Sequence, residues 1–152
     1  MRRIVLLVVL LGGAGLGYRY YSKSYAPAEH YKRFAEAVLH RQYDRAAEMA
    51  DGLTADQLQH SGSQEHIYAG PEMFQTLFSS RFNVESCETA ADGGVTIHAT
   101  QTVLFNPAGV ESTRPAMYAL MKQTVGLRKG DAGWKVTSFD NKFEKMDSMS
   151  GR

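Results

Sequence analysis

Two glutamines are the strongest candidates for a polar site in this chain of 152 residues. Gln101 lies in the segment VTIHATQTVLF and Gln123 in the segment MYALMKQTVGL, and every second neighbour of each glutamine is apolar. Because side chains alternate between the two faces of a strand, both amides are predicted to point inward and to line a cavity. The alternative is a position at a sheet edge, or a register shifted by one residue, which would turn each amide to solvent.

Asp140 and Tyr31 are two further candidates for the same cavity. Asp140 and Glu88 are the acidic residues nearest to the glutamines, and both lie near the ends of predicted strands. Asp140 is taken as a polar contact of the cavity, and Tyr31, in the first predicted helix, is taken as a possible acid. A buried carboxylate with a raised pKa beside Tyr31 would favour an enzyme, whereas an interior filled by Phe and Met side chains would favour a binding module.

The remaining reactive side chains indicate neither a metal site nor a nucleophile. The single cysteine excludes a cysteine-built zinc or iron–sulfur site, and no two histidines have the i,i+4 spacing of a helical zinc motif. Cys87 has Glu85 and Glu88 as neighbours, and their negative charges oppose formation of a thiolate. We therefore predict no catalytic residue, no metal and no cofactor.

The amino-terminal segment has the composition of a membrane anchor. Residues 1–23 contain no acidic residue and include the apolar run IVLLVVLLGGAGLGY. A helix over this run spans ~22 Å, or ~27 Å when it continues to Tyr21, compared with ~30 Å for the hydrocarbon core of a bilayer. A secretory signal peptide is the alternative, because Gly15 and Gly17 could occupy the −3 and −1 positions of a cleavage site. We favour an uncleaved single-pass anchor that contacts membrane lipid through residues 4–21.

Charge indicates the orientation of this anchor and argues against one class of partner. Arg2 and Arg3 favour a cytoplasmic amino terminus, which places the main domain in the periplasm of a bacterium, tethered to the inner membrane. The net charge of the whole chain is +1, and its basic surplus lies in residues 1–23. A dedicated nucleic-acid binder has a basic surplus in its folded domain, so nucleic acid is excluded as a partner.

Helical patterns fill the first half of the remaining sequence. Apolar residues recur at helical spacing over 28–50, between Pro27 and Gly52, and predict one long helix. The sequence from Thr54 to Gln57 matches a capping box and predicts a second, short helix. A third helix is predicted over 71–82, where PEMFQTLFSSRF carries an apolar stripe.

The second half of the sequence is typical of strands joined by short turns, which must be antiparallel. Turn signals lie at 92–94 and at 130–133, and a longer loop at 106–115. The predicted strands are 83–89, 95–105, 117–129 and 134–143. Helices followed by strands indicate the α+β class, with the helices packed on a curved antiparallel sheet. The predicted organisation is an anchor over 1–23, a domain over 24–144 and a disordered tail over 145–152.

This order of elements resembles the nuclear transport factor 2-like superfamily. Three segments carry the resemblance: FAEAVLHRQYDRAAEMA, GPEMFQTLF and VGLRKGDAGWKVTSFD. The resemblance implies a cone-shaped domain, which in the family's isomerases, cyclases and hydrolases holds an active-site cavity. It also implies, for members with an amino-terminal anchor, a role such as that of the periplasmic scaffold component of type IV secretion systems. The carboxylates of the family's enzymes have no matching set in this sequence.

The function expected from these observations is a membrane-tethered, exported binding or assembly module that is not an enzyme. Its expected partner is a protein or a second copy of the chain, bound through the exposed face of the sheet. One alternative is a small-ligand-binding protein or a cavity enzyme with the same fold. Another is a soluble secreted domain released by signal cleavage.

Overall fold

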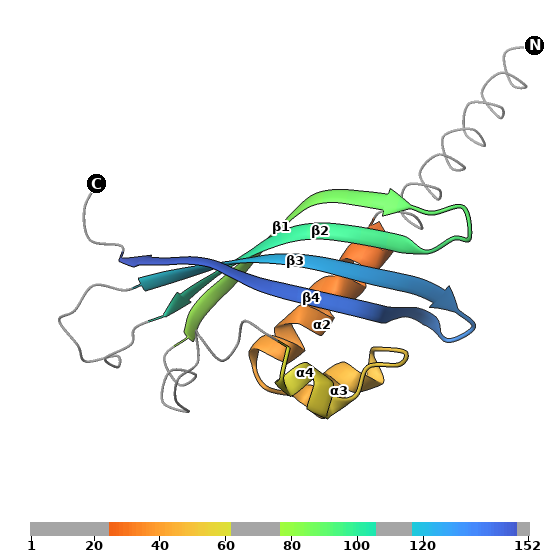
Figure 1. Cartoon of the computed structure of the whole chain (residues 1–152), viewed down its shortest axis with the longest axis horizontal. Coiled ribbons are helices and arrows are strands. Elements are labelled where there is room, and N and C mark those ends of the chain that lie inside the picture. Colours follow the sequence, from red (N-terminus) through yellow and green to blue (C-terminus); the bar gives the residue numbers. More distant parts are fainter. Residues whose placement is uncertain (1–24, 62–76, 106–116, 149–152) are drawn as a thin grey trace, which may run out of the picture.

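Three helices and a four-stranded sheet make up the part of the chain that the computed structural model describes, residues 25–61, 77–105 and 117–148. The helices are α2 (Ala26–Leu39), α3 (Tyr43–Glu48) and α4 (Ala55–Gln59), and the strands are β1 (Leu77–Thr89), β2 (Val95–Phe105), β3 (Met117–Gly130) and β4 (Gly133–Ser148). The strands are antiparallel in the order β1-β2-β3-β4, and α2 lies across one face of the sheet (Figure 1). Helices followed by strands confirm the predicted α+β class.

The predicted membrane anchor over 1–23 lies outside the described residues. None of the helices within the described ranges is both long and apolar enough to cross a bilayer.

The long helix predicted over 28–50 is wrong, because the chain forms two helices there, α2 and α3. Arg41 has a left-handed backbone conformation with a φ of 56°. The N–H of Arg41 donates to the carbonyl of Val38 at 3.1 Å, and the N–H of Gln42 donates to the carbonyl of Ala37 at 2.9 Å. These two bonds form a Schellman motif, which ends a helix. The motif usually has glycine at the left-handed position, so the arginine here gives no sequence signal for the break.

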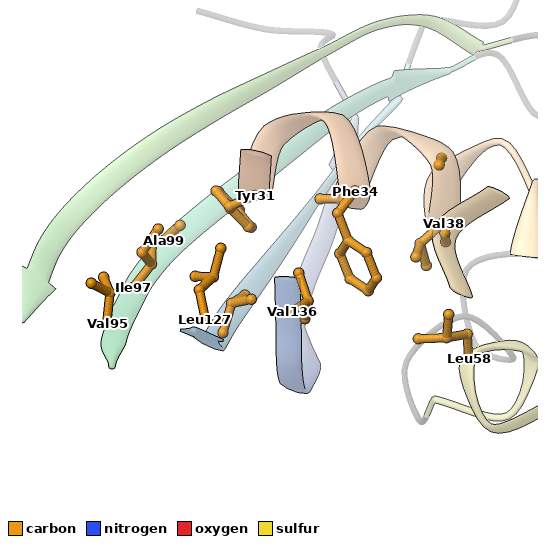
Figure 2. Close-up of a cluster of buried hydrophobic side chains, with 13 residues drawn as sticks. Tyr31, Phe34, Val38, Leu58, Val95, Ile97, Ala99, Leu127 and Val136 are labelled. Atoms are coloured by element: carbon orange, nitrogen blue, oxygen red, sulfur yellow. The ribbon is translucent and has the colours of Figure 1, made fainter. Parts of the chain in front are cut away.

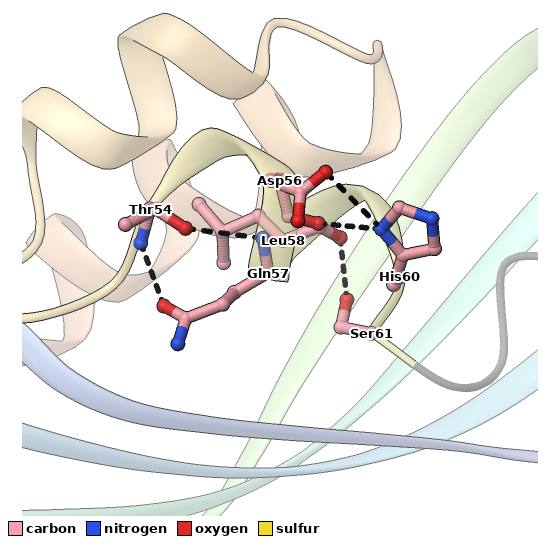
Figure 3. A network of polar contacts seen from close by, with 6 residues as sticks. All are labelled: Thr54, Asp56, Gln57, Leu58, His60 and Ser61. Atoms are coloured by element: carbon pink, nitrogen blue, oxygen red, sulfur yellow. Dashed lines mark hydrogen bonds and ion pairs between the residues drawn. The ribbon is translucent and has the colours of Figure 1, made fainter.

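The predicted capping box is confirmed at the start of α4 (Figure 3). The N–H of Gln57 donates to Thr54 Oγ1 at 3.2 Å, and the N–H of Thr54 donates to Gln57 Oε1 at 2.9 Å. The helix has only five residues, too few to be stable alone, and Leu58 is its one buried side chain. The cap and Leu58 together therefore hold α4 against the core.

Replacing Thr54 with alanine is expected to lower the free energy of unfolding by about 1 kcal/mol, because the N–H of Gln57 loses its acceptor. Urea denaturation of the full chain in detergent micelles measures the change. Gln59→Ala on the same helix is the control, since Gln59 is exposed, and its effect should stay within about 0.5 kcal/mol. Equal effects of the two variants would show that the cap does not stabilise the domain.

The third predicted helix, 71–82, is wrong where the structure describes it, because 77–82 belong to β1; residues 71–76 lie outside the described ranges. Along β1, partly buried Phe82 and Val84 alternate with exposed Arg81 and Asn83, as strand geometry requires. Apolar residues in this stretch fit both a helical and an alternating pattern. Pairing with β2, in which Phe82 lies opposite Gln101, decides for the strand.

The other strands confirm the predicted positions, with differences at their ends. β2 has the predicted bounds, and buried residues alternate along its whole length. β4 continues to Ser148, which pairs with Met117, so 145–148 form part of the sheet instead of the predicted tail. The register of β4 shifts at two points, and each shift is a bulge that accommodates one extra residue. Gly133, with a φ of 112°, closes the β3–β4 turn.

The main hydrophobic core lies between α2 and the inner face of the sheet. Side chains of α2 such as Phe34 and Val38 face Ile97, Leu127 and Val136 from the strands (Figure 2). The ring of Phe34 also packs edge-to-face on Phe139, with ring centroids 5.1 Å apart. A second cluster, formed by Leu39, Val103, Phe105, Ala119 and Met121, continues the core along the sheet.

Candidate functional site

Three of the four side chains predicted to line a cavity meet inside the domain. The hydroxyl of Tyr31 on α2 donates a hydrogen bond to Gln123 Oε1 on β3, at 2.6 Å. Gln123 Nε2 donates to Gln101 Oε1 on β2, at 2.7 Å. All three residues are at most 3% exposed, so the amides predicted to face inward do so.

Asn141 is a fourth member of this cluster and was not predicted. Its Oδ1 accepts the second hydrogen bond from Gln123 Nε2, at 3.1 Å. The residue is 6% exposed and pairs with Gln123 across β3 and β4. Alternation along β4 contained a signal for it, because Asn141 lies two residues from Phe139 and from Phe143 on the same face. We refer to Tyr31, Gln101, Gln123 and Asn141 as the amide cluster.

The structure does not bring Asp140 to the amide cluster. Its side chain is 56% exposed and forms an ion pair with Lys142 at 2.9 Å. Asp140 is the immediate neighbour of Asn141, so strand alternation places its side chain on the opposite face of the sheet.

The sheet register explains how the cluster assembles. Gln101 lies opposite Met121, two residues from Gln123, so the two glutamines are diagonal neighbours on one face. Diagonal neighbours are within reach of each other when their side chains are long. Tyr31 reaches the pair from α2, with its ring edge-to-face on Phe82 at a centroid distance of 5.8 Å. A helix and three strands thus meet at Gln123.

The amide cluster is electrically neutral. Burial raises the pKa of Tyr31 above its usual value, so the phenol stays protonated and acts as a hydrogen-bond donor at neutral pH. The other three members are amides, which do not titrate. The arrangement therefore favours hydrogen bonding over proton transfer.

An open groove of about 550 Å³ lies on another part of the domain, between α2, the end of α3 and the β3–β4 turn. We call it the hairpin groove. Its lining residues are Tyr25, Ala26, Glu29, His30, Arg33, Glu48, Met49, Ala132, Gly133, Trp134 and Lys135. Its volume falls within the range of about 300–1,000 Å³ that is usual for ligand sites.

Hydrogen bonds fix the walls of the hairpin groove. The N–H of Val136 donates to the carbonyl of Met49 at 3.1 Å, and the N–H of Asp51 donates to the carbonyl of Val136 at 2.7 Å. His30 Nε2 lies 3.0 Å from the same Met49 carbonyl, and Lys135 Nζ donates to the carbonyl of Glu48. These bonds tie the end of α3 to both α2 and β4, so the groove is largely preformed.

The groove presents aromatic and charged groups to solvent. Tyr25 is 50% exposed, and Trp134 packs partly against the core. Arg33 is exposed and uses its Nε to donate to the carbonyl of Glu29, at 3.4 Å. Within the described ranges, neither Arg33 nor the Glu48 carboxylate forms an ion pair. Sequence patterns missed this site because its residues come from three separate segments.

The outer face of the sheet is polar, and many of its side chains pair with each other. Lys122 forms an ion pair with Glu144 at 2.7 Å, and the hydrogen bond that its ammonium donates to this carboxylate raises the pKa of Lys122. Thr124 Oγ1 lies 3.3 Å from His98 Nδ1, and Thr100 donates to Glu85. Partners on this face would have to displace these contacts.

Among the described residues, no group of three or more His, Cys, Asp or Glu side chains could hold a metal ion. Comparison of the chain with family models, curated proteins and solved structures finds no match.

Proposed function

We propose that the chain is a binding module, tethered to a membrane, that holds a segment of a partner protein in the hairpin groove. The observation that supports this most is the combination of Tyr25, Trp134 and Arg33 along one preformed groove. Tyr, Trp and Arg are the residue types most often found at the energetic centres of protein interfaces.

The charges of the groove define the chemistry of the partner. Arg33 can offer the four N–H groups of its two terminal nitrogens, a geometry that matches a carboxylate. Tyr25 and Trp134 offer apolar area beside it. The partner segment should therefore carry an acidic residue close to an aromatic or aliphatic one. Glu48, which also lines the groove, would accept a basic residue of the same segment.

The amide cluster supports this function indirectly, by fixing the orientation of α2. Tyr31 faces the sheet and is bonded to Gln123, whereas Glu29, His30 and Arg33 lie on the side of the same helix that lines the groove. Rotation of α2 about its axis would break the buried hydrogen bond of Tyr31. The interior thus holds Arg33 in place relative to Trp134.

The proposed docking surface is the hairpin groove, whereas the sequence led us to expect the outer face of the sheet. On the outer face, ion pairs and hydrogen bonds already engage Lys122, Glu144, Asp140 and Lys142. Exposed ion pairs of this kind contribute little binding energy when a partner replaces them. In the groove, Arg33 is free of such a pair within the described part of the chain.

The proposal includes the periplasmic location and the nuclear transport factor 2-like fold expected from the sequence. Tyr25 follows the predicted anchor within a few residues, so the groove would open close to the outer surface of the inner membrane. The packing of α2 across one face of an antiparallel sheet supports the cone-shaped fold. Labelling of a cysteine introduced at Thr124 of the Cys87→Ser variant, in intact cells with a membrane-impermeant reagent, tests the location.

Photo-crosslinking tests the groove. The full chain, in its native membranes, carries benzoylphenylalanine in place of Ala132 in the groove or of Thr124 on the outer face. We expect the probe at 132 to form an adduct with an acidic segment of one partner protein. Trp134→Ala or Arg33→Ala should reduce the yield of this adduct at least ~10-fold, as expected for interface residues worth about 1.4 kcal/mol or more.

Lys142→Ala is the matched control, because it removes an exposed cation on the outer face. An adduct formed only by the probe at 124, or one insensitive to Trp134 and Arg33, would refute the groove as the docking site. An adduct with a second copy of the chain would show that the groove mediates self-association and does not bind a different protein.

A further inference from the structure

One atom in the core lacks the hydrogen-bond partner that its burial requires. Gln101 Nε2 is fully buried and has no acceptor among the described residues, while the whole residue is 2% exposed. A buried amide donor without a partner costs roughly 1–3 kcal/mol. Such groups are rare in folded proteins, and each one calls for an explanation.

Turning the amides does not remove this requirement. As oriented, Tyr31 and Gln123 use all of their donors inside the cluster. With the oxygen and nitrogen of Gln101 and Gln123 exchanged, Gln123 Nε2 would donate to the Tyr31 hydroxyl, whose own proton would then lose its acceptor. Gln123 Oε1 would also take the place of Nε2, which lies 3.1 Å from Asn141 Oδ1, so two acceptors would face each other. The observed orientation therefore gathers the unused donors on a single atom, Gln101 Nε2.

We infer that Gln101 Nε2 binds an oxygen acceptor that is not part of the protein, at a site inside the core. The acceptor should be uncharged, because apart from the amide cluster the side chains nearest to Gln101 on the inner face of the sheet are apolar. Ala99 and Val103 flank it along β2, Met121 lies opposite on β3, and all three are at most 2% exposed. An ion in these surroundings would lose its hydration without gaining a counter-charge.

Two sources supply this chemistry, a buried water molecule and the carbonyl, ether or hydroxyl oxygen of a small organic ligand. A buried water usually makes about three hydrogen bonds, and one N–H of this amide would supply one of them. The site is separate from the hairpin groove, so its failure leaves the proposed function unaffected.

Nuclear magnetic resonance of the ¹⁵N-labelled full chain in detergent micelles tests this inference. We expect a rotating-frame cross-peak between the side-chain NH₂ protons of Gln101 and either water or carbon-bound protons of a co-purified molecule. The cross-peak should be lost in Gln101→Leu. The NH₂ group of Gln123 is the internal control and should show no such peak, because both of its protons have protein acceptors.

A second variant excludes transfer of magnetisation through the phenol. Tyr31→Phe removes the hydroxyl that donates to Gln123, and the Gln101 cross-peak should persist. A peak with water identifies a structural water, and an adduct seen by native mass spectrometry of the wild type but not of Gln101→Leu identifies an organic ligand. The inference is overturned if Gln101 shows neither peak, or if its NH₂ group is bonded to a carbonyl of this chain.

Discussion

Replacing Gln123 with leucine is expected to lower the free energy of unfolding by about 4 kcal/mol. The amide makes three buried hydrogen bonds, to Tyr31, Gln101 and Asn141. Leucine fills a similar volume but leaves the Tyr31 hydroxyl without its acceptor and two amide oxygens without their shared donor. Each buried polar group left without a partner costs about 1–3 kcal/mol. Urea denaturation of the full chain in detergent micelles measures the loss.

Thr124→Val is the matched control, because Thr124 is the next residue on β3 and lies on the exposed face. Its effect should stay within about 0.5 kcal/mol. A loss for Gln123→Leu no larger than this would show that the amide cluster does not stabilise the fold.

A second variant of the same residue, Gln123→Glu, separates hydrogen bonding from packing. Burial should raise the pKa of the new carboxyl above its unfolded value of about 4.3. Below the unfolded pKa the carboxyl is protonated in both states and carries no ionisation penalty. As the pH rises from there toward the folded pKa, the penalty grows and then levels off. The deficit of Gln123→Glu relative to the wild type should therefore shrink as the pH falls toward about 4 and stay constant below it.

Alternation along the strands made the interior of the sheet predictable from the sequence. Gln101 and Gln123 each interrupt an apolar series with a period of two, and both turn inward as this pattern predicts. The same alternation places Asp140 on the outer face, because its neighbour Asn141 lies on the inner face together with Phe139 and Phe143. The prediction favoured an acid for its chemistry, whereas the strand pattern would have selected the amide.

The elements that sequence reasoning missed depend on contacts between distant segments or on unusual residues. The break between α2 and α3 uses Arg41 where glycine is usual. The beginning of β1 has a pattern that also fits a helix, and its pairing with β2 is not visible in the local sequence. The hairpin groove is formed by segments around Arg33, Met49 and Trp134, which are far apart along the chain.

Replacing Phe34 with alanine is expected to lower the free energy of unfolding by about 4 kcal/mol. Phe34 is fully buried between α2 and the sheet, and its ring packs on Phe139 of β4. Alanine would leave a cavity in the contact between α2 and the sheet, and α2 is the helix that carries both Tyr31 and Arg33. Urea denaturation of the full chain in detergent micelles measures this loss of unfolding free energy.

Phe34→Leu provides the matched comparison, since it keeps most of the apolar volume and loses the edge-to-face contact of the rings. Its cost should be well below that of the alanine variant. Because α2 also supplies one wall of the hairpin groove, loosening the helix should reduce the crosslink from position 132 more in Phe34→Ala than in Phe34→Leu. If the alanine variant unfolds at the same midpoint urea concentration as the wild type, the core between α2 and the sheet does not hold the domain together. A crosslink yield unchanged in the destabilised variant would show that the groove does not depend on how α2 is seated on the sheet.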